Sequence, residues 1–288
     1  MLAIAPAVLY AITVNVVPFA YSFGASAILV LALRFSTNIA FASVISLGKP
    51  QSKTVIQSSE RLALFVISIA LIGQTYGMLM ALKSLPVSVA ITIFFTFPIL
   101  SYFIEQIKKR TRPHLVAIAA LLTSLIGVWL MTSTPHSNWN VQAIWWPLLS
   151  SVLQATIQGL AESVHSVRGW KMVKITSIVP AVIFVAMAAS EAQSVSLFAL
   201  IWAFVAATGF CLAMYFLFVS VRINGALRSA NMLYLEPIMA IPISLTIHHD
   251  TLSLLQYVGI ALIALGCFVI EWRERRSSFT SQENVTAL

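Results

Sequence analysis

One carboxylate inside an apolar stretch is the group in this sequence best suited to chemistry. Glu236 lies within residues 229–245, SANMLYLEPIMAIPISL, directly before Pro237. If this stretch crosses a bilayer, an acidic side chain near its middle costs about 2.5–3.5 kcal/mol, so its presence asks for a reason. Glu236 could bind an amine or carry a proton. The alternative is a carboxylate that only packs against a neighbouring helix.

Two amides form a second polar feature in an apolar segment. Gln154 and Gln158 are four residues apart and therefore lie on one face of a helix. Polar contacts between membrane helices contribute only about 0.6 kcal/mol on average, so stability alone does not call for them. We expect both amides to line a cavity.

The remaining candidate side chains are aromatic, amide or cationic. Tyr76 and Tyr215 are expected to form a pair of aromatic walls or gates, with core packing as the alternative. Arg34, inside an apolar run, is expected to make a structural ion pair or to clamp carbonyl groups, with binding of an anion as the alternative. Weaker candidates for contact with a bound solute are Asn15, Tyr102 and Asn231.

Two prolines interrupt apolar segments that are otherwise helical. Pro98 and Pro237 cannot donate a backbone hydrogen bond, which frees a carbonyl four residues earlier. Such a carbonyl is tolerated in a membrane where it faces protein or a wet cavity. Both prolines are therefore predicted hinges.

Motifs for catalysis or for cofactors do not stand out. No glycine-rich phosphate loop, Ser/His/Asp set or pair of catalytic acids occurs, so we expect no enzyme activity and no cofactor. The run His248-His249-Asp250 lacks a third histidine nearby and is expected to be a solvated turn and not a metal site.

The composition indicates whether these side chains lie in a soluble domain or in a lipid bilayer. Of 288 residues, 59% are hydrophobic and 9% are charged, which excludes an ordinary soluble domain. At about 20 apolar residues per helical crossing, we expect ten spans, at residues 2–20, 24–47, 62–82, 87–106, 113–132, 144–163, 172–189, 197–219, 226–247 and 253–272.

The basic residues fix the expected orientation. Nearly all of the 17 Lys and Arg fall in alternate loops, which become cytoplasmic if both termini are cytoplasmic. This distribution explains the net charge of +8 without a nucleic-acid partner. The polar tail, residues 277–288, is expected to be disordered and cytoplasmic.

An internal repeat organises the chain. A shift of 139 positions, without a gap, superposes Tyr76 on Tyr215, Lys83 on Arg222, Pro98 on Pro237, Leu115 on Leu254 and Gly127 on Gly266. Because the shift spans five crossings, the halves would enter the membrane in opposite directions. The sequence thus predicts an all-α protein of two inverted five-helix repeats, residues 1–135 and 136–276, an architecture typical of transporters.

Several motifs also resemble a known family, the EamA-type drug/metabolite transporters. They are Arg34-Phe35 in the second span, Phe97-Pro98 in the fourth, Tyr234-Leu235-Glu236-Pro237 in the ninth, and Gly259 with Gly266 in the tenth. The resemblance implies ten helices in a 5+5 arrangement, a central cavity, more often efflux than uptake, and a functional monomer. The Trp-Gly pair usual in the first span of that family is absent.

We therefore expect a secondary transporter of a bacterial inner membrane that exports small polar or amphipathic metabolites such as amino acids, by alternating access. Its expected partners are the solute, the lipid bilayer and, through Glu236, protons. The first alternative is a carrier of phosphorylated metabolites or nucleotide-sugars, disfavoured because few cations lie at mid-membrane. The second is a non-transporting or lipid-moving membrane protein.

Overall fold

The fold is seen in a computed structural model that describes residues 4–47, 56–85, 87–132, 141–191, 195–248 and 253–286. In these residues the chain is helical throughout, with no strand. Twelve α-helices and one short 3₁₀ helix follow one another: α1 Ala5–Ser22, α2 Ala27–Ser46, α3 Ser58–Ser84, α4 Val87–Phe94, α5 Phe97–Lys109, α6 Leu115–Thr132, η1 Val141–Ile144, α7 Trp145–Ser163, α8 Trp170–Ser190, α9 Leu197–Asn224, α10 Ala226–Met232, α11 Leu235–His248 and α12 Leu254–Thr286.

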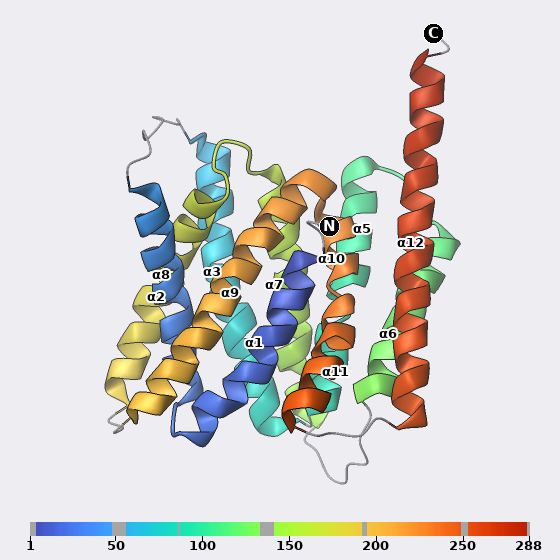
Figure 1. The fold of residues 1–288 in the computed structure, drawn as a ribbon. Helices are drawn as coiled ribbons and strands as arrows, with labels where there is room; N and C mark the ends of the chain where they lie inside the picture. Colours follow the sequence, from blue (N-terminus) through green and yellow to red (C-terminus); the bar gives the residue numbers. More distant parts are fainter. Residues whose placement is uncertain are drawn as a thin grey trace.

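The helices are long and apolar enough to make this a multi-pass membrane protein. Among the described residues, six helical segments meet the length and hydropathy needed to cross a bilayer, and α6 and α12 carry shorter apolar stretches. The bundle is shown in Figure 1, where α1 begins at the end of the bundle beyond which α12 projects. Apolar surface faces outward on most helices, as expected for contact with lipid.

Four helix pairs make the most extensive contacts, namely α6 with α12, α1 with α9, α2 with α8, and α3 with α7. Small residues allow the closest of these approaches. A Cβ atom added to Gly127 in α6 would lie 2.6 Å from the carbonyl O of Gly259 in α12. A Cβ on Gly266 in α12 would lie 2.5 Å from the carbonyl O of Ala120 in α6.

Some contacts join residues that the 139-residue shift makes equivalent. Asn38 Nδ2 in α2 donates to Ser177 Oγ in α8 at 2.9 Å, across a separation of 139. The two glycine contacts between α6 and α12 are likewise exchanged by the shift, which carries Gly127 to Gly266 and Ala120 to Gly259.

Two predicted spans are interrupted near their middles. The helix stops at Phe95 and Thr96 between α4 and α5, and at Leu233 and Tyr234 between α10 and α11. Each break lies a few residues before its proline, so that Pro98 and Pro237 occupy the first turn of the following half-helix, where a missing N–H is tolerated. The carbonyl of Leu233, predicted to be freed by Pro237, instead accepts from Glu236 N at 2.9 Å, because the chain tightens into a turn there.

The C-terminal segment also differs from the sequence prediction. Residues 277–286, expected to be a disordered tail, continue α12 as helix to Thr286 (Figure 1). The segment contains no proline or glycine that would end a helix already started in the apolar stretch.

Candidate functional site

The two helix breaks meet inside the bundle. Phe95, at the break between α4 and α5, stacks on Tyr234, at the break between α10 and α11, with ring centroids 5.8 Å apart and an interplanar angle of 23°. Both rings are buried. Non-helical backbone at membrane depth is tolerated only where protein or a wet cavity surrounds it. The stacked rings therefore mark the centre around which the candidate site is built.

Glu236 lies next to this centre, in the first turn of α11. The start of a helix carries a partial positive charge, which stabilises a carboxylate there. Glu236 interacts electrostatically with Tyr10 in α1 and with Arg34 in α2. The half-helix thus explains in part how an acidic side chain is accommodated at this depth.

Asn15 joins the same helices by its side-chain amide. Its Nδ2 donates to the carbonyl O of Ala11 at 2.9 Å within α1 and to the carbonyl O of Ala240 at 3.2 Å in α11. The first bond stays within α1 and orients the amide, and the second joins α1 to α11. This contact positions α11, and with it Glu236.

Arg34 in α2 interacts electrostatically with Tyr21 and Tyr10 and, to a smaller extent, with Glu236. Its guanidinium carbon lies 5.0 Å from the centre of the Phe210 ring in α9, a cation–π contact. Among the described residues, its buried Nε has no hydrogen-bond partner, and no carboxylate lies within salt-bridge distance of its guanidinium. The structural ion pair expected for Arg34 stays a prediction. In this structure Arg34 and Glu236 interact electrostatically, but their charged groups are farther apart than in a salt bridge.

The two amides of α7 are buried, as are the polar groups near the break in α10 and α11. Neither Oε1 nor Nε2 of Gln158 has a hydrogen-bond partner among the described residues, and Gln154 is buried one turn away. Asn231 donates to the carbonyl O of Cys267 at 3.4 Å. In the part of the chain that the structure describes, its Oδ1 has no hydrogen-bond partner, and neither does the hydroxyl of Tyr234. Buried polar groups are nearly always paired, so this concentration of unpaired ones marks an interior suited to a polar guest.

Tyr76 and Tyr215 do not meet one another in the structure. Tyr76 contacts Trp146 edge-on at 6.3 Å between ring centroids, and Tyr215 stacks on Trp170 at 4.3 Å. Their role as walls or gates stays a prediction, with each tyrosine paired to its own tryptophan.

Tyr102 has a structural partner outside the centre. Its hydroxyl accepts a hydrogen bond from His114 N at 2.7 Å, which ties α5 to the start of α6. We expect Tyr102→Phe to lower the free energy of unfolding by about 1 kcal/mol, because one hydrogen bond is lost. Transport should remain at the level of the unmodified protein. Thermal unfolding and solute flux, measured on the same preparation, check both statements. A loss of flux without a loss of stability would instead favour the contact with solute that the sequence suggested.

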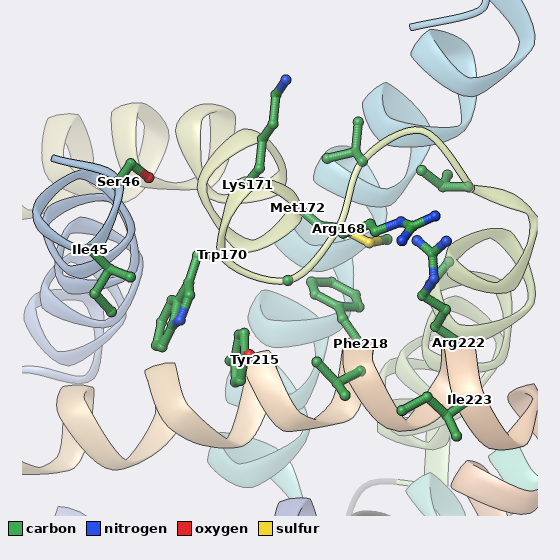
Figure 2. Close-up of a pocket in the computed structure, with 15 residues that line it drawn as sticks. Ile45, Ser46, Arg168, Trp170, Lys171, Met172, Tyr215, Phe218, Arg222 and Ile223 are labelled. Carbon is green, nitrogen blue, oxygen red and sulfur yellow. The ribbon is translucent and has the colours of Figure 1, made fainter. Parts of the chain in front are cut away.

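A cavity of about 490 Å³ opens at the end of the bundle where α2, α7 and α9 finish and α8 begins (Figure 2). Its lining includes Arg168, Trp170, Tyr215 and Arg222. From the sequence, the basic residues of this loop were interpreted only as markers of the orientation of the protein in the membrane. The available signal for a binding surface was an arginine two residues before a tryptophan, in Arg168-Gly169-Trp170.

Sequence reasoning also missed Tyr10, Phe95 and Phe210. Phe95 could have been found, because it is 139 positions from Tyr234 and thus its equivalent in the repeat. Tyr10 and Phe210 are single aromatic residues in apolar helices and carry no such signal.

As for metals, the described residues hold no cluster of three His, Cys, Asp or Glu side chains, and His249 and Asp250 lie outside them.

Comparison with known proteins agrees with this picture. Residues 142–272 match the sequence profile of the EamA-like transporter family. Similar folds occur in 28 solved chains, and one crystal structure matches 93% of this chain and 96% of its own chain, with a TM-score of 0.75 and 15% sequence identity. At that identity the likeness concerns the fold alone. No curated protein matches the sequence. The chain is thus a multi-pass membrane protein whose residues 142–272 match the EamA-like transporter family.

Proposed function

We propose that this protein is a secondary transporter that exports small zwitterionic or amphipathic metabolites, with amino acids as the leading class, by alternating access. The single observation that carries the substrate class is the occurrence of a basic and an acidic side chain, Arg34 and Glu236, close enough to interact electrostatically but not, among the described residues, joined in a salt bridge. A solute with one carboxylate and one ammonium group could pair with both side chains at once, its carboxylate with Arg34 and its ammonium group with Glu236.

The surroundings of this pair support the same substrate class. Phe210 and Tyr10 place aromatic surface beside the two charges, and the unpaired amide of Gln158 lies buried in α7. Ligand sites are mostly apolar with a few convergent polar groups, so an apolar side chain flanked by hydrogen-bonding ends would suit this centre.

The proposed mechanism uses two inverted halves, residues 1–135 and 136–276, and ten membrane crossings. Contacts between residues related by the 139-residue shift, such as Asn38 with Ser177 and Phe95 with Tyr234, support a two-fold axis through the bundle. In such an architecture one half rocks against the other around a fixed site near the midplane.

The helix breaks are the proposed hinges. A non-helical pair of residues before Pro98 and another before Pro237 lets each half-helix change direction without loss of hydrogen bonds along a whole helix. The charges themselves are not symmetric, since the shift carries Glu236 to Phe97 and Arg34 to Val173. Each half therefore contributes one charge to the site.

The remaining parts of the proposal are residence in a bacterial inner membrane, cytoplasmic termini, a monomeric unit and coupling to protons at Glu236. The placement of nearly all of the 17 basic residues in alternate loops supports this orientation. A carrier of phosphorylated solutes is the competing proposal.

A counterflow assay in proteoliposomes tests the substrate class. Vesicles loaded with unlabelled solute should take up labelled zwitterionic amino acid, and should take up the matching amine without its carboxylate, or the acid without its amine, at least tenfold more slowly. The reason is that each analogue leaves one buried charge unpaired. Exchange of sugar phosphates and not of amino acids would favour the competing carrier. Absence of exchange with any solute class, in vesicles of verified orientation, would count against transport.

A further inference from the structure

The cavity at the end of the bundle is separate from the central site and carries its own chemistry. It is formed by the end of α2, the loop between α7 and α8, the first turn of α8 and the last turns of α9 (Figure 2). Neither Arg34 nor Glu236 belongs to its lining. Whatever occupies it is therefore recognised by a different set of side chains.

Two guanidinium groups form the cationic wall of the cavity. Figure 2 shows the side chains of Arg168 and Arg222 next to one another at one end of it. Arg222 donates to the carbonyl O of His165 at 3.2 Å, and neither arginine has a described carboxylate within salt-bridge distance. Two neighbouring positive charges without an acidic partner favour an anion between them.

Two carboxylates of the neighbouring segments, Glu162 and Glu60, already have partners. Glu162, near the end of α7, lies 3.6 Å from Nζ of Lys108. Glu60 in α3 accepts hydrogen bonds from His165 N at 2.8 Å, from Ser166 N at 3.1 Å and from the hydroxyl of Ser166. These bonds fix the loop that carries Arg168, so the cationic wall is held in place.

The opposite wall is aromatic and apolar. Trp170 stacks on Tyr215 with ring centroids 4.3 Å apart and an interplanar angle of 14°. Gly169 has a φ of +50°, and a Cβ there would lie 3.1 Å from the Tyr215 ring, so a glycine lets the loop close onto this stack. Ile223, at the edge of the cavity, is 62% exposed. Ile223 thus gives the cavity an exposed apolar rim.

We propose that this cavity binds a phosphate group, carried by an anionic phospholipid headgroup or by a soluble phosphate ester. Arginine pairs phosphate oxygens through two parallel N–H donors, and two arginines can do so from two sides. The apolar rim at Ile223 favours the lipid, because its glycerol and acyl carbons would lie against the rim while its phosphate reaches the arginines.

The test compares full-length proteins in detergent by calorimetric titration with short-chain phosphatidylglycerol, and separately with glycerol 3-phosphate. Short-chain phosphatidylcholine, which is net neutral, is the lipid control. Arg168→Gln is the first variant, since the Arg168 side chain makes no hydrogen bond to the described residues and its backbone bond from Lys171 N is kept in the variant. The double change Arg168→Gln with Arg222→Gln is the second. Arg112→Gln removes one exposed positive charge from the loop between α5 and α6, outside the cavity, and is the matched control.

We expect phosphatidylglycerol to bind about tenfold more weakly to Arg168→Gln and more weakly still to the double variant, with Arg112→Gln unchanged. If only glycerol 3-phosphate shows this dependence, the phosphate site stands and its source is the soluble ester. Equal binding by all variants, or equal weakening by Arg112→Gln, overturns the proposal. Thermal unfolding of each variant separates loss of binding from loss of fold. Transport of amino acids is a separate readout, so either proposal can fail without the other.

Discussion

Glu236→Gln is expected to raise the KM for a zwitterionic solute by about 10- to 100-fold, because it removes a charged hydrogen-bond partner worth roughly 1.5–3 kcal/mol. If Glu236 also carries the coupled proton, the variant should exchange solute in counterflow but no longer respond to an imposed pH gradient. Flux measured in proteoliposomes with and without that gradient separates the two effects.

Stability should not fall in this variant, because a neutral amide avoids the cost of a buried charge. Glu105→Gln is the matched control, since Glu105 pairs with Lys109 near the end of α5, away from the helix breaks. Its flux and its gradient response should equal those of the unmodified protein. Gradient-driven transport with unchanged KM in Glu236→Gln would leave Glu236 only its packing role.

Gly266→Ala is expected to destabilise the protein by about 3 kcal/mol, the upper end of what overpacking usually costs. The added Cβ would lie 2.5 Å from the carbonyl O of Ala120 and 3.1 Å from Ser124 N. Because both are backbone atoms, α6 and α12 would have to separate. Thermal unfolding and yield from detergent extraction measure the effect.

Gly159→Ala is the matched control for this change. The nearest heavy atoms to its added Cβ lie 3.7 Å away, at ordinary contact distance, and a helical alanine is favoured over glycine by up to about 1 kcal/mol. We expect its stability to be unchanged or higher. Equal unfolding temperatures for Gly266→Ala and Gly159→Ala would show that α6 and α12 are not held at the observed separation.

The sequence predicted most of the helical architecture because apolar length is a strong and local signal. It also predicted that the spans containing Pro98 and Pro237 would be interrupted, since the missing N–H acts on the residues immediately before it. The positions of the two helix breaks were predicted less accurately. The turn at Leu233 and Tyr234 depends on the bond from Glu236 N to Leu233 O, which a residue pattern does not reveal.

Partners in space were harder to predict than helices. Tyr76 and Tyr215 were predicted from their positions in the repeat as a pair of aromatic walls or gates, which does not specify the neighbours of each ring. Tyr76 instead contacts Trp146 and Tyr215 contacts Trp170. The proximity of Arg34 to Glu236 and the cavity beside Arg168 likewise depend on how distant helices pack, which apolar periodicity does not specify.

The contacts between Asn38 and Ser177, and between Phe95 and Tyr234, bear on how such a chain can diversify. In an antiparallel dimer of one five-helix subunit, each position on the axis would meet its own copy, so every substitution there would be made twice. Joining both subunits in a single polypeptide removes that constraint. Phenylalanine can then face tyrosine, and an amide donor can face a hydroxyl acceptor. In the proposed inverted repeat, covalent fusion thus gives each half the freedom to acquire its own charge, one at Arg34 and the other at Glu236.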